Sequence, residues 1–213
     1  MADPKRAGST AGDRYLLLAD VSGYTAFMAN VERAHGVDFS AGIPAGFAIL
    51  GELLDAVIEG VQPDFEVAKL EGDAVFATAN VALLDGRGDA VLARLNRVYR
   101  AFRARREQAR AARDHVCTAC PVVASLDLKM VLHRGQAVRH TIASQTDVLG
   151  PAVNVVHRLL KNGIQARLGY RPYLFLTDAA ANGLLLSEAG VEHHEDYPDV
   201  GSISGRVVGL EAD

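Results

Sequence analysis

Short apolar runs alternate with longer amphipathic stretches along the chain. Residues 15–19 form an unbroken apolar run, which is typical of a buried strand because it is too short and too uniform for an exposed helix. Residues 65–70 and 74–79 are two further strand-like runs, joined by a turn at 71–73 that contains a glycine. This spacing predicts a β-hairpin.

Apolar residues recur at helical spacing in the stretches around these runs. We expect helices at residues 22–33, 44–60 and 85–113. Residues 126–132 and 136–142 predict a second hairpin. It would turn at Arg134-Gly135. The other expected elements are a helix between Gly150-Pro151 and Asn162-Gly163, a strand at 173–176, a helix at 178–187 and a last strand at 207–210.

Two hairpins interleaved with helices predict an α+β fold, with helices packed on one mainly antiparallel sheet rather than a doubly wound parallel sheet. The 213 residues are enough to bury a full core. The first dozen residues are polar and small. We therefore expect a disordered tail at residues 1–13 and a single domain at residues 14–213.

Composition and charge limit the classes of function. Hydrophobic residues make up 49% and charged residues 23%, which are ordinary values for a soluble globular protein. The net charge of -4 argues against a general polyanion-binding protein. No apolar run approaches the ~20 residues of a membrane span, and no apolar signal region opens the chain. We expect a cytoplasmic protein that does not engage a membrane.

The predicted helix at 85–113 is strongly basic. A nucleic acid or an anionic lipid could bind such a face. We favour a solvated face, because the whole chain is acidic and no aromatic residues interleave for base stacking. Its arginines are Arg94, Arg97, Arg100, Arg103, Arg105, Arg106, Arg110 and Arg113.

The chain's two cysteines, Cys117 and Cys120, form a single Cys-x-x-Cys pair. Such a pair supplies at most half of a four-cysteine zinc site. Two reduced thiols in a loop are the favoured interpretation. A zinc ion shared across a dimer, or completed by His115, is the alternative.

Two carboxylates, Asp20 and Asp73, each follow a strand-like run and stand near a glycine. Isolated aspartates in such places are most often turn formers. If the fold brings the two together, they can hold a hard divalent cation against phosphate groups. Farther along, Asn154 and Arg158 stand four residues apart on a predicted helix and share a face. Alone, that helix would be an ordinary amphipathic one.

The blocks together resemble the catalytic domain of class III nucleotidyl cyclases. Asp20-Val-Ser-Gly-Tyr-Thr25 and Lys69-Leu-Glu-Gly-Asp73 are similar to that family's first motif and to its Lys-x-x-Gly-Asp hairpin. Residues 128–135 resemble its Arg-x-Gly-x-His-x-Gly strand, and residues 147–158 resemble its third motif. The resemblance spans roughly residues 14–210 and implies a ferredoxin-like cyclase fold. Within this group, the chain is most similar to bacterial cyclase-like proteins of unknown function.

The resemblance also implies roles for the matched residues. Asp20 and Asp73 would bind Mg²⁺ or Mn²⁺, and Asn154 would orient the ribose. Arg158 would stabilise charge on the α-phosphoryl group in the transition state. The nucleotide's terminal phosphates would lie against the backbone N–H groups from Val21 through Ser22, Gly23, Tyr24 and Thr25.

Lys69 and Asp147 would read the base. An ammonium donates to adenine N1 and a carboxylate accepts from the N6 amine, so ATP is the favoured nucleotide, and another purine nucleotide is the alternative. In the family, the metal ligands come from one subunit, and the base-reading residues come from its partner. A homodimer with two sites is therefore expected.

One departure from the family concerns a lysine near its C-terminal end that binds the terminal phosphates. Ser204 stands at the nearest match here, and Arg206, two residues on, could substitute for the lysine. The first hypothesis is an adenylate cyclase that makes 3′,5′-cyclic AMP and pyrophosphate from ATP with two metal ions. The alternative is a catalytically weak or inactive nucleotide-binding, regulatory module, and a purely structural interaction protein comes third.

Several other polar residues have plainer interpretations. We expect Glu71 to be solvated, and His133 and His157 to be packed or hydrogen-bonded rather than catalytic. Adjacent residues alternate in direction, so we expect His193-His194-Glu195-Asp196 to form a solvated loop rather than a metal site.

Overall fold

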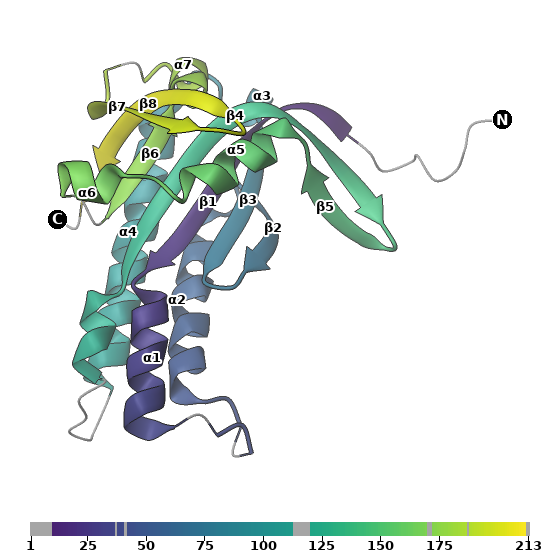
Figure 1. The fold of residues 1–213 in the computed structure, drawn as a ribbon. Coiled ribbons are helices and arrows are strands. Elements are labelled where there is room, and N and C mark those ends of the chain that lie inside the picture. The colour runs from purple at the N-terminus through teal and green to yellow at the C-terminus, as the bar shows by residue number, and fades with distance from the viewer. Residues whose placement is uncertain are drawn as a thin grey trace.

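The protein's computed structural model describes residues 10–36, 38–40, 42–112, 120–169, 172–186 and 188–211. Within these residues an eight-stranded sheet has the order β2-β3-β1-β4-β6-β8-β7, and β5 pairs with β4 (Figure 1). Among the described strands only the β4–β6 pair is parallel, which confirms the α+β prediction. The strands are β1 (Thr10–Ser22), β2 (Glu66–Glu71), β3 (Ala74–Asn80), β4 (Asp127–Ile142), β5 (Gln145–Leu149), β6 (Tyr173–Thr177), β7 (Val191–Tyr197) and β8 (Gly201–Gly209).

The helices cover both faces of this sheet, with α1, α2 and α4 on one face and α5 on the other (Figure 1). Alternate residues of β1 serve the two faces, as the period of a strand requires. Leu17 packs on the side of α1, α2 and α4, whereas Leu16 packs with Val156 of α5. The helices are α1 (Tyr24–His35), α2 (Ala45–Val61), α3 (Val81–Leu84), α4 (Gly88–Ala111), α5 (Pro151–Leu159), α6 (Ile164–Leu168) and α7 (Asp178–Leu184). No helix in the described part of the chain is long and apolar enough to cross a membrane.

Helices α2 and α4 approach each other closely at Gly60. A β-carbon added there would lie 2.9 Å from Cγ2 of Val98 on α4.

The basic residues of α4 are not all solvated. Arg106 is buried and its Nη1 donates to the carbonyl oxygen of Leu126 at 2.6 Å. Arg113 and Cys117 lie outside the described residues, and Cys120 begins a 3-10 segment (Cys120–Ser125).

The second hairpin lies later than predicted. Strand β4 runs through Arg134 and Gly135 without a turn, because β1 pairs with it along the whole of Thr10–Ser22. The chain reverses instead at Ala143 and Ser144, whose φ angles are 49° and 71°. Left-handed angles at both central residues suit a tight hairpin turn. Residues 10–13, which we assigned to the tail, belong to β1.

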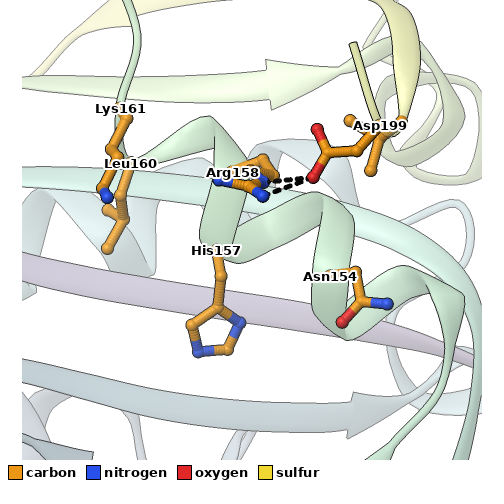
Figure 2. Close-up of a pocket in the computed structure, with 7 residues that line it drawn as sticks. Asn154, His157, Arg158, Leu160, Lys161 and Asp199 are labelled. Carbon is orange, nitrogen blue, oxygen red and sulfur yellow. Dashed lines mark hydrogen bonds and ion pairs between the residues drawn. The ribbon is translucent and has the colours of Figure 1, made fainter. Parts of the chain in front are cut away.

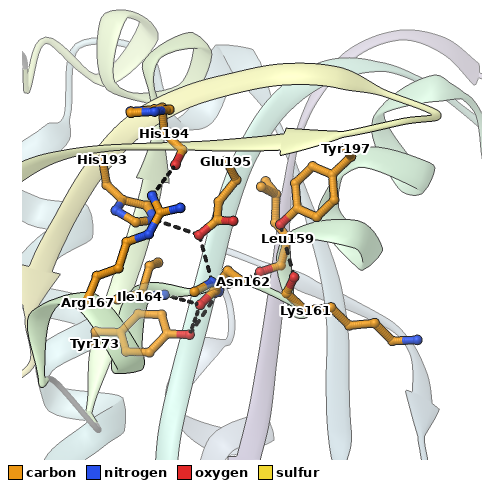
Figure 3. Close-up of polar contacts among 11 residues, drawn as sticks. Leu159, Lys161, Asn162, Ile164, Arg167, Tyr173, His193, His194, Glu195 and Tyr197 are labelled. Atoms are coloured by element: carbon orange, nitrogen blue, oxygen red, sulfur yellow. Dashed lines mark hydrogen bonds and ion pairs between the residues drawn. The ribbon is translucent and has the colours of Figure 1, made fainter.

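The expected loop at His193–Asp196 is wrong, since these residues form the middle of β7. Both His193 and Glu195 are buried, and His193 Nε2 lies 2.7 Å from Glu195 Oε1 (Figure 3). The same oxygen accepts the N–H of Gly163 at 2.7 Å, at the start of α6. His193 and Glu195, which we expected to be solvated, are therefore buried where β7 packs beside the corner between α5 and α6.

Candidate functional site

Asp20 and Asp73 lie side by side near one end of the central strands. Asp20 of β1 is in register with Ala74 of β3, the residue after Asp73. The N–H of Val21 donates to the carbonyl oxygen of Asp73 at 3.0 Å, which fixes the turn against β1. Burial raises the pKa of Asp73, and the negative charge of Asp20 raises it further. The β1–β3 register and the Val21 hydrogen bond thus make the two aspartates neighbours at this end of the sheet.

Lys129 of β4 completes this acidic corner. Its Nζ lies 3.1 Å from Oδ2 of Asp20, and it also donates to the carbonyl oxygen of Leu160 at 3.4 Å. Its charge lowers the pKa of Asp73, against the effect of burial. We did not single out Lys129 from the sequence. The signal was its place in the strand at 128–135, but only the β1–β4 register sets it opposite Asp20.

Lys69 and Asp147 form a second group on β2 and β5. Lys69 Nζ lies 3.5 Å from Oδ1 of Asp147 and 3.0 Å from Oε1 of Glu71. It also lies 5.8 Å from the centroid of the Phe76 ring. Burial by itself lowers the pKa of Lys69, but Glu71 and Asp147 together outweigh it and leave the pKa raised. The two residues with an expected base-reading role are therefore paired within one chain.

We expected Glu71 to be solvated, but both of its carboxylate oxygens have partners. Its Oε2 lies 2.6 Å from Nε2 of His157, while its Oε1 pairs with Lys69. The other ring nitrogen of His157 lies 2.7 Å from the carbonyl oxygen of Val153. Both ring nitrogens of His157 therefore have a polar partner. Glu71 and His157 tie the β2–β3 hairpin to α5.

Helix α5 carries Asn154 and Arg158 along an open pocket of about 650 Å³ (Figure 2). The helix begins after Gly150, whose φ is 138° and whose added β-carbon would lie 2.9 Å from the Gln136 carbonyl oxygen. Arg158 points across the pocket to Asp199, with its Nε and Nη2 at 2.6 and 2.5 Å from Oδ2 (Figure 2). This carboxylate, from the turn between β7 and β8, was not anticipated.

The expected phosphate-binding segment lies at the start of α1. Gly23 has a φ of 87°, and the first turn of α1 has no side-chain cap. Ser22 ends β1, and Tyr24 and Thr25 begin the helix, close to Asp20. The amide of Val21 is already bound to the Asp73 carbonyl, so it is not available to a phosphate.

Arg206 is not brought to the aspartate pair. It is in register with Leu176 of β6, which faces the α1, α2 and α4 side of the sheet. Its Nε donates to the Ala189 carbonyl at 2.8 Å, and its Nη1 pairs with Glu192 at 3.2 Å. Asp20 faces the opposite side with α5, because it alternates with Ala19 of the first side. A substitute phosphate contact from Arg206 within the same chain is therefore not formed.

His133 has a structural environment, as its place in a strand suggested. Its Nδ1 lies 3.0 Å from the Thr177 hydroxyl, and burial lowers its pKa to about 4.

Comparison with known proteins begins with a family model. Residues 50–168 match the model described as "Protein of unknown function (DUF2652)". The chain belongs to this family. It is also 30% identical over 166 residues to "Uncharacterized protein Rv2561/Rv2562" of Mycobacterium tuberculosis, covering 76% of this chain and 73% of that protein.

Several solved structures resemble this chain in fold. The guanylyl cyclase Cya2 matches with a TM-score of 0.68 at 14% identity, covering 96% of this chain and 95% of that one. A bacterial light-regulated adenylyl cyclase matches with a TM-score of 0.65 at 16% identity, covering 99% of this chain. The chain spans only 56% of the length of that light-regulated protein. At these identities the likeness establishes the class III cyclase fold and nothing finer.

Proposed function

We propose that the chain is an adenylate cyclase-like protein that converts ATP to 3′,5′-cyclic AMP and pyrophosphate. The observation that carries the proposal is that the residues expected in each half of a shared site lie together within the chain. Asp20 and Asp73 are neighbours at one end of the sheet, and the Lys69–Asp147 pair lies beside the helix that presents Arg158.

The donor set suits a hard divalent cation, because Asp20 and Asp73 offer carboxylate oxygens and no softer ligand. These two side chains would hold Mg²⁺ or Mn²⁺. When bound, such a cation lowers the pKa of the ribose 3′-hydroxyl and neutralises phosphate charge. The backbone amides in the first turn of α1, which has no side-chain cap, would bind the terminal phosphates.

The helix α5 would supply orientation and positive charge. In the reaction the 3′-oxygen attacks the α-phosphorus and gives its proton to solvent water, while the bond to the pyrophosphate oxygen breaks and pyrophosphate leaves. Arg158 would bind the α-phosphoryl oxygens as their charge develops, exchanging Asp199 for phosphate. Asn154, one turn earlier on the same pocket wall, would hold the ribose.

Lys69 and Asp147 would select adenine. Their charged groups are 3.5 Å apart, so a donor and an acceptor stand next to each other. Adenine offers the complementary order, an acceptor at N1 beside an amine at N6. Glu71 would keep the ammonium in place while the base binds.

We propose a homodimer as the active form, in which Asp20 and Asp73 of one subunit face Lys69 and Arg158 of the other. The arm formed by β4 and β5 extends beyond the rest of the sheet and leaves Ile142 and Leu149 exposed (Figure 1). Exposed apolar side chains on such an arm are suited to contact a second subunit.

The test is direct. Purified protein with ATP and Mn²⁺ is expected to form cyclic AMP, measured by chromatography. Asp20→Asn is expected to lower the rate about a hundredfold or more. Asp55→Asn, an exposed carboxylate on α2, serves as the matched control and keeps the rate. Product that persists in Asp20→Asn, or a folded wild type that makes none, refutes the cyclase activity.

A second candidate is a nucleotide-binding, regulatory module without efficient turnover. One observation favours it: both arginines expected to bind phosphate already have partners in the chain. Arg158 pairs with Asp199, and Arg206 donates to the Ala189 carbonyl on the face of the sheet opposite to Asp20. Calorimetric binding of ATP with Mn²⁺, without cyclic product, is the result that supports this candidate over the enzyme.

A further inference from the structure

Lys129 forms an ion pair with Asp20, one of the two carboxylates that would bind a metal ion. It lies opposite Asp20 in the β1–β4 register and opposite Tyr173 in the β4–β6 register. The Lys129 and Asp20 side chains are only 22% and 16% exposed. An ion pair so sheltered is less screened by salt than a surface pair.

The local charge count is informative. Asp20 and Asp73 contribute two formal negative charges, and the Lys129 ammonium cancels one of them. A divalent cation bound to Asp20 would stand within a few ångströms of that ammonium. At such distances repulsion between like charges is large at the effective dielectric of a protein surface. Without a nucleotide, metal binding at Asp20 and Asp73 is therefore opposed by Lys129 of the same chain.

A polyphosphate removes this opposition in two ways. Its negative charge offsets the added cation, and its oxygens offer the ammonium another partner. Lys129 has a flexible stem, and its second acceptor, the Leu160 carbonyl at 3.4 Å, is neutral. The ammonium can thus leave Asp20 without leaving this part-buried carboxylate unpaired, provided that the metal takes its place.

We propose that Lys129 is a built-in counter-ion of Asp20 that makes divalent-metal binding conditional on a polyphosphate ligand. The inference rests on the metal site of the proposed function. It goes further by assigning the order of events: Lys129 holds the site closed to free metal, and metal and nucleotide bind together. A lysine that served only to stabilise the sheet would not change the affinity for metal in this selective way.

Mn²⁺ titrations of the full chain without nucleotide test the first half of the proposal. Lys129→Met removes the charge at similar length and is expected to bind Mn²⁺ about tenfold or more tightly than the wild type. Lys129→Arg keeps the charge and is expected to bind as weakly as the wild type. Adding Asp20→Asn to Lys129→Met is expected to abolish the gain. If the Met variant fails to fold by circular dichroism, Lys129→Gln takes its place.

Thermal unfolding tests the second half, since a ligand that binds only the folded state raises the melting temperature. Mn²⁺ alone is expected to stabilise Lys129→Met but not the wild type, and Mn²⁺ with ATP is expected to stabilise both. Equal Mn²⁺ affinity in wild type and Lys129→Met overturns the inference. If Asp20→Asn still removes that binding, the metal site of the proposed function stands. Absence of Mn²⁺ binding in every protein, with and without ATP, overturns both.

Discussion

Replacing Glu195 by alanine is expected to destabilise the fold far more than its place in an acidic, histidine-rich stretch suggests. The side chain is 10% exposed, and its Oε1 accepts from Gly163 N and contacts His193 Nε2, both at 2.7 Å (Figure 3). Gly163 follows Asn162, which exchanges hydrogen bonds with the Tyr173 hydroxyl at 2.9 and 3.0 Å. Glu195 thus anchors edge strand β7 to the α5–α6 corner.

The magnitude follows from the groups left behind. Alanine removes the acceptor from one part-buried backbone N–H and one buried imidazole, and a polar group costs about 1–3 kcal/mol when it is left buried and unpaired. The expected loss is about 2–5 kcal/mol in the free energy of unfolding. Glu195→Gln keeps an acceptor oxygen at the same reach and is expected to cost about 1 kcal/mol.

Urea unfolding followed by circular dichroism measures these differences, provided that the slope with urea stays constant among the variants. Glu192→Ala is the matched control, because it lies on the same strand, is 86% exposed and pairs with Arg206. A surface pair of this kind is expected to contribute about 1 kcal/mol or less. If Glu195→Ala is as mild as Glu192→Ala, the buried network does not stabilise the fold and the argument fails.

Three further predictions concern stability and assembly. Burial lowers the pKa of His133 from 6.5 to about 4, so its contribution to stability is complete above pH 6.5 and declines toward pH 4, as the unfolded chain takes the proton first. The free energy of unfolding, measured at a series of pH values, is expected to fall by up to about 3 kcal/mol. His133→Gln should flatten this pH dependence, and an unchanged pH profile in that variant contradicts the assignment. Gly60→Ala should cost about 1–3 kcal/mol, because its β-carbon would lie 2.9 Å from helix α4. Gly51→Ala on the same helix meets nothing within 4 Å and should be neutral or stabilising, so equal effects of the two on thermal unfolding would refute the packing argument. Mixing inactive Asp20→Asn with inactive Arg158→Ala should restore about a quarter of wild-type cyclase activity if each site is shared between subunits, whereas no recovery would mean that each site belongs to one chain.

Much of the candidate site is local, and the sequence predicts it well. The Lys69–Asp73 hairpin forms as its pattern indicates, since apolar runs flank a short turn with a glycine. Likewise Gly150 and Pro151 begin α5 where expected, which sets Asn154 and Arg158 on one pocket wall. Their cyclase roles stay predictions.

The errors arise where a neighbour in space overrides a local signal. Gly135 resembles a turn residue, but pairing with β1 keeps β4 extended through it. Glu195 alternates with polar neighbours, but the α5–α6 corner buries it. Neither partner is visible from the nearby sequence.

By itself, the sequence of this protein determined the alternation of strands and helices, the α+β class and the residue types gathered at the turns, because each depends on periodicity and backbone preference over a few residues. Only the tertiary structure decided which charges meet. Lys129 reaches Asp20 through the register of two strands more than a hundred residues apart, and Asp199 reaches Arg158 from a turn beyond two further strands. Ion pairs depend on distance in space, and the sheet's strand order and register set that distance.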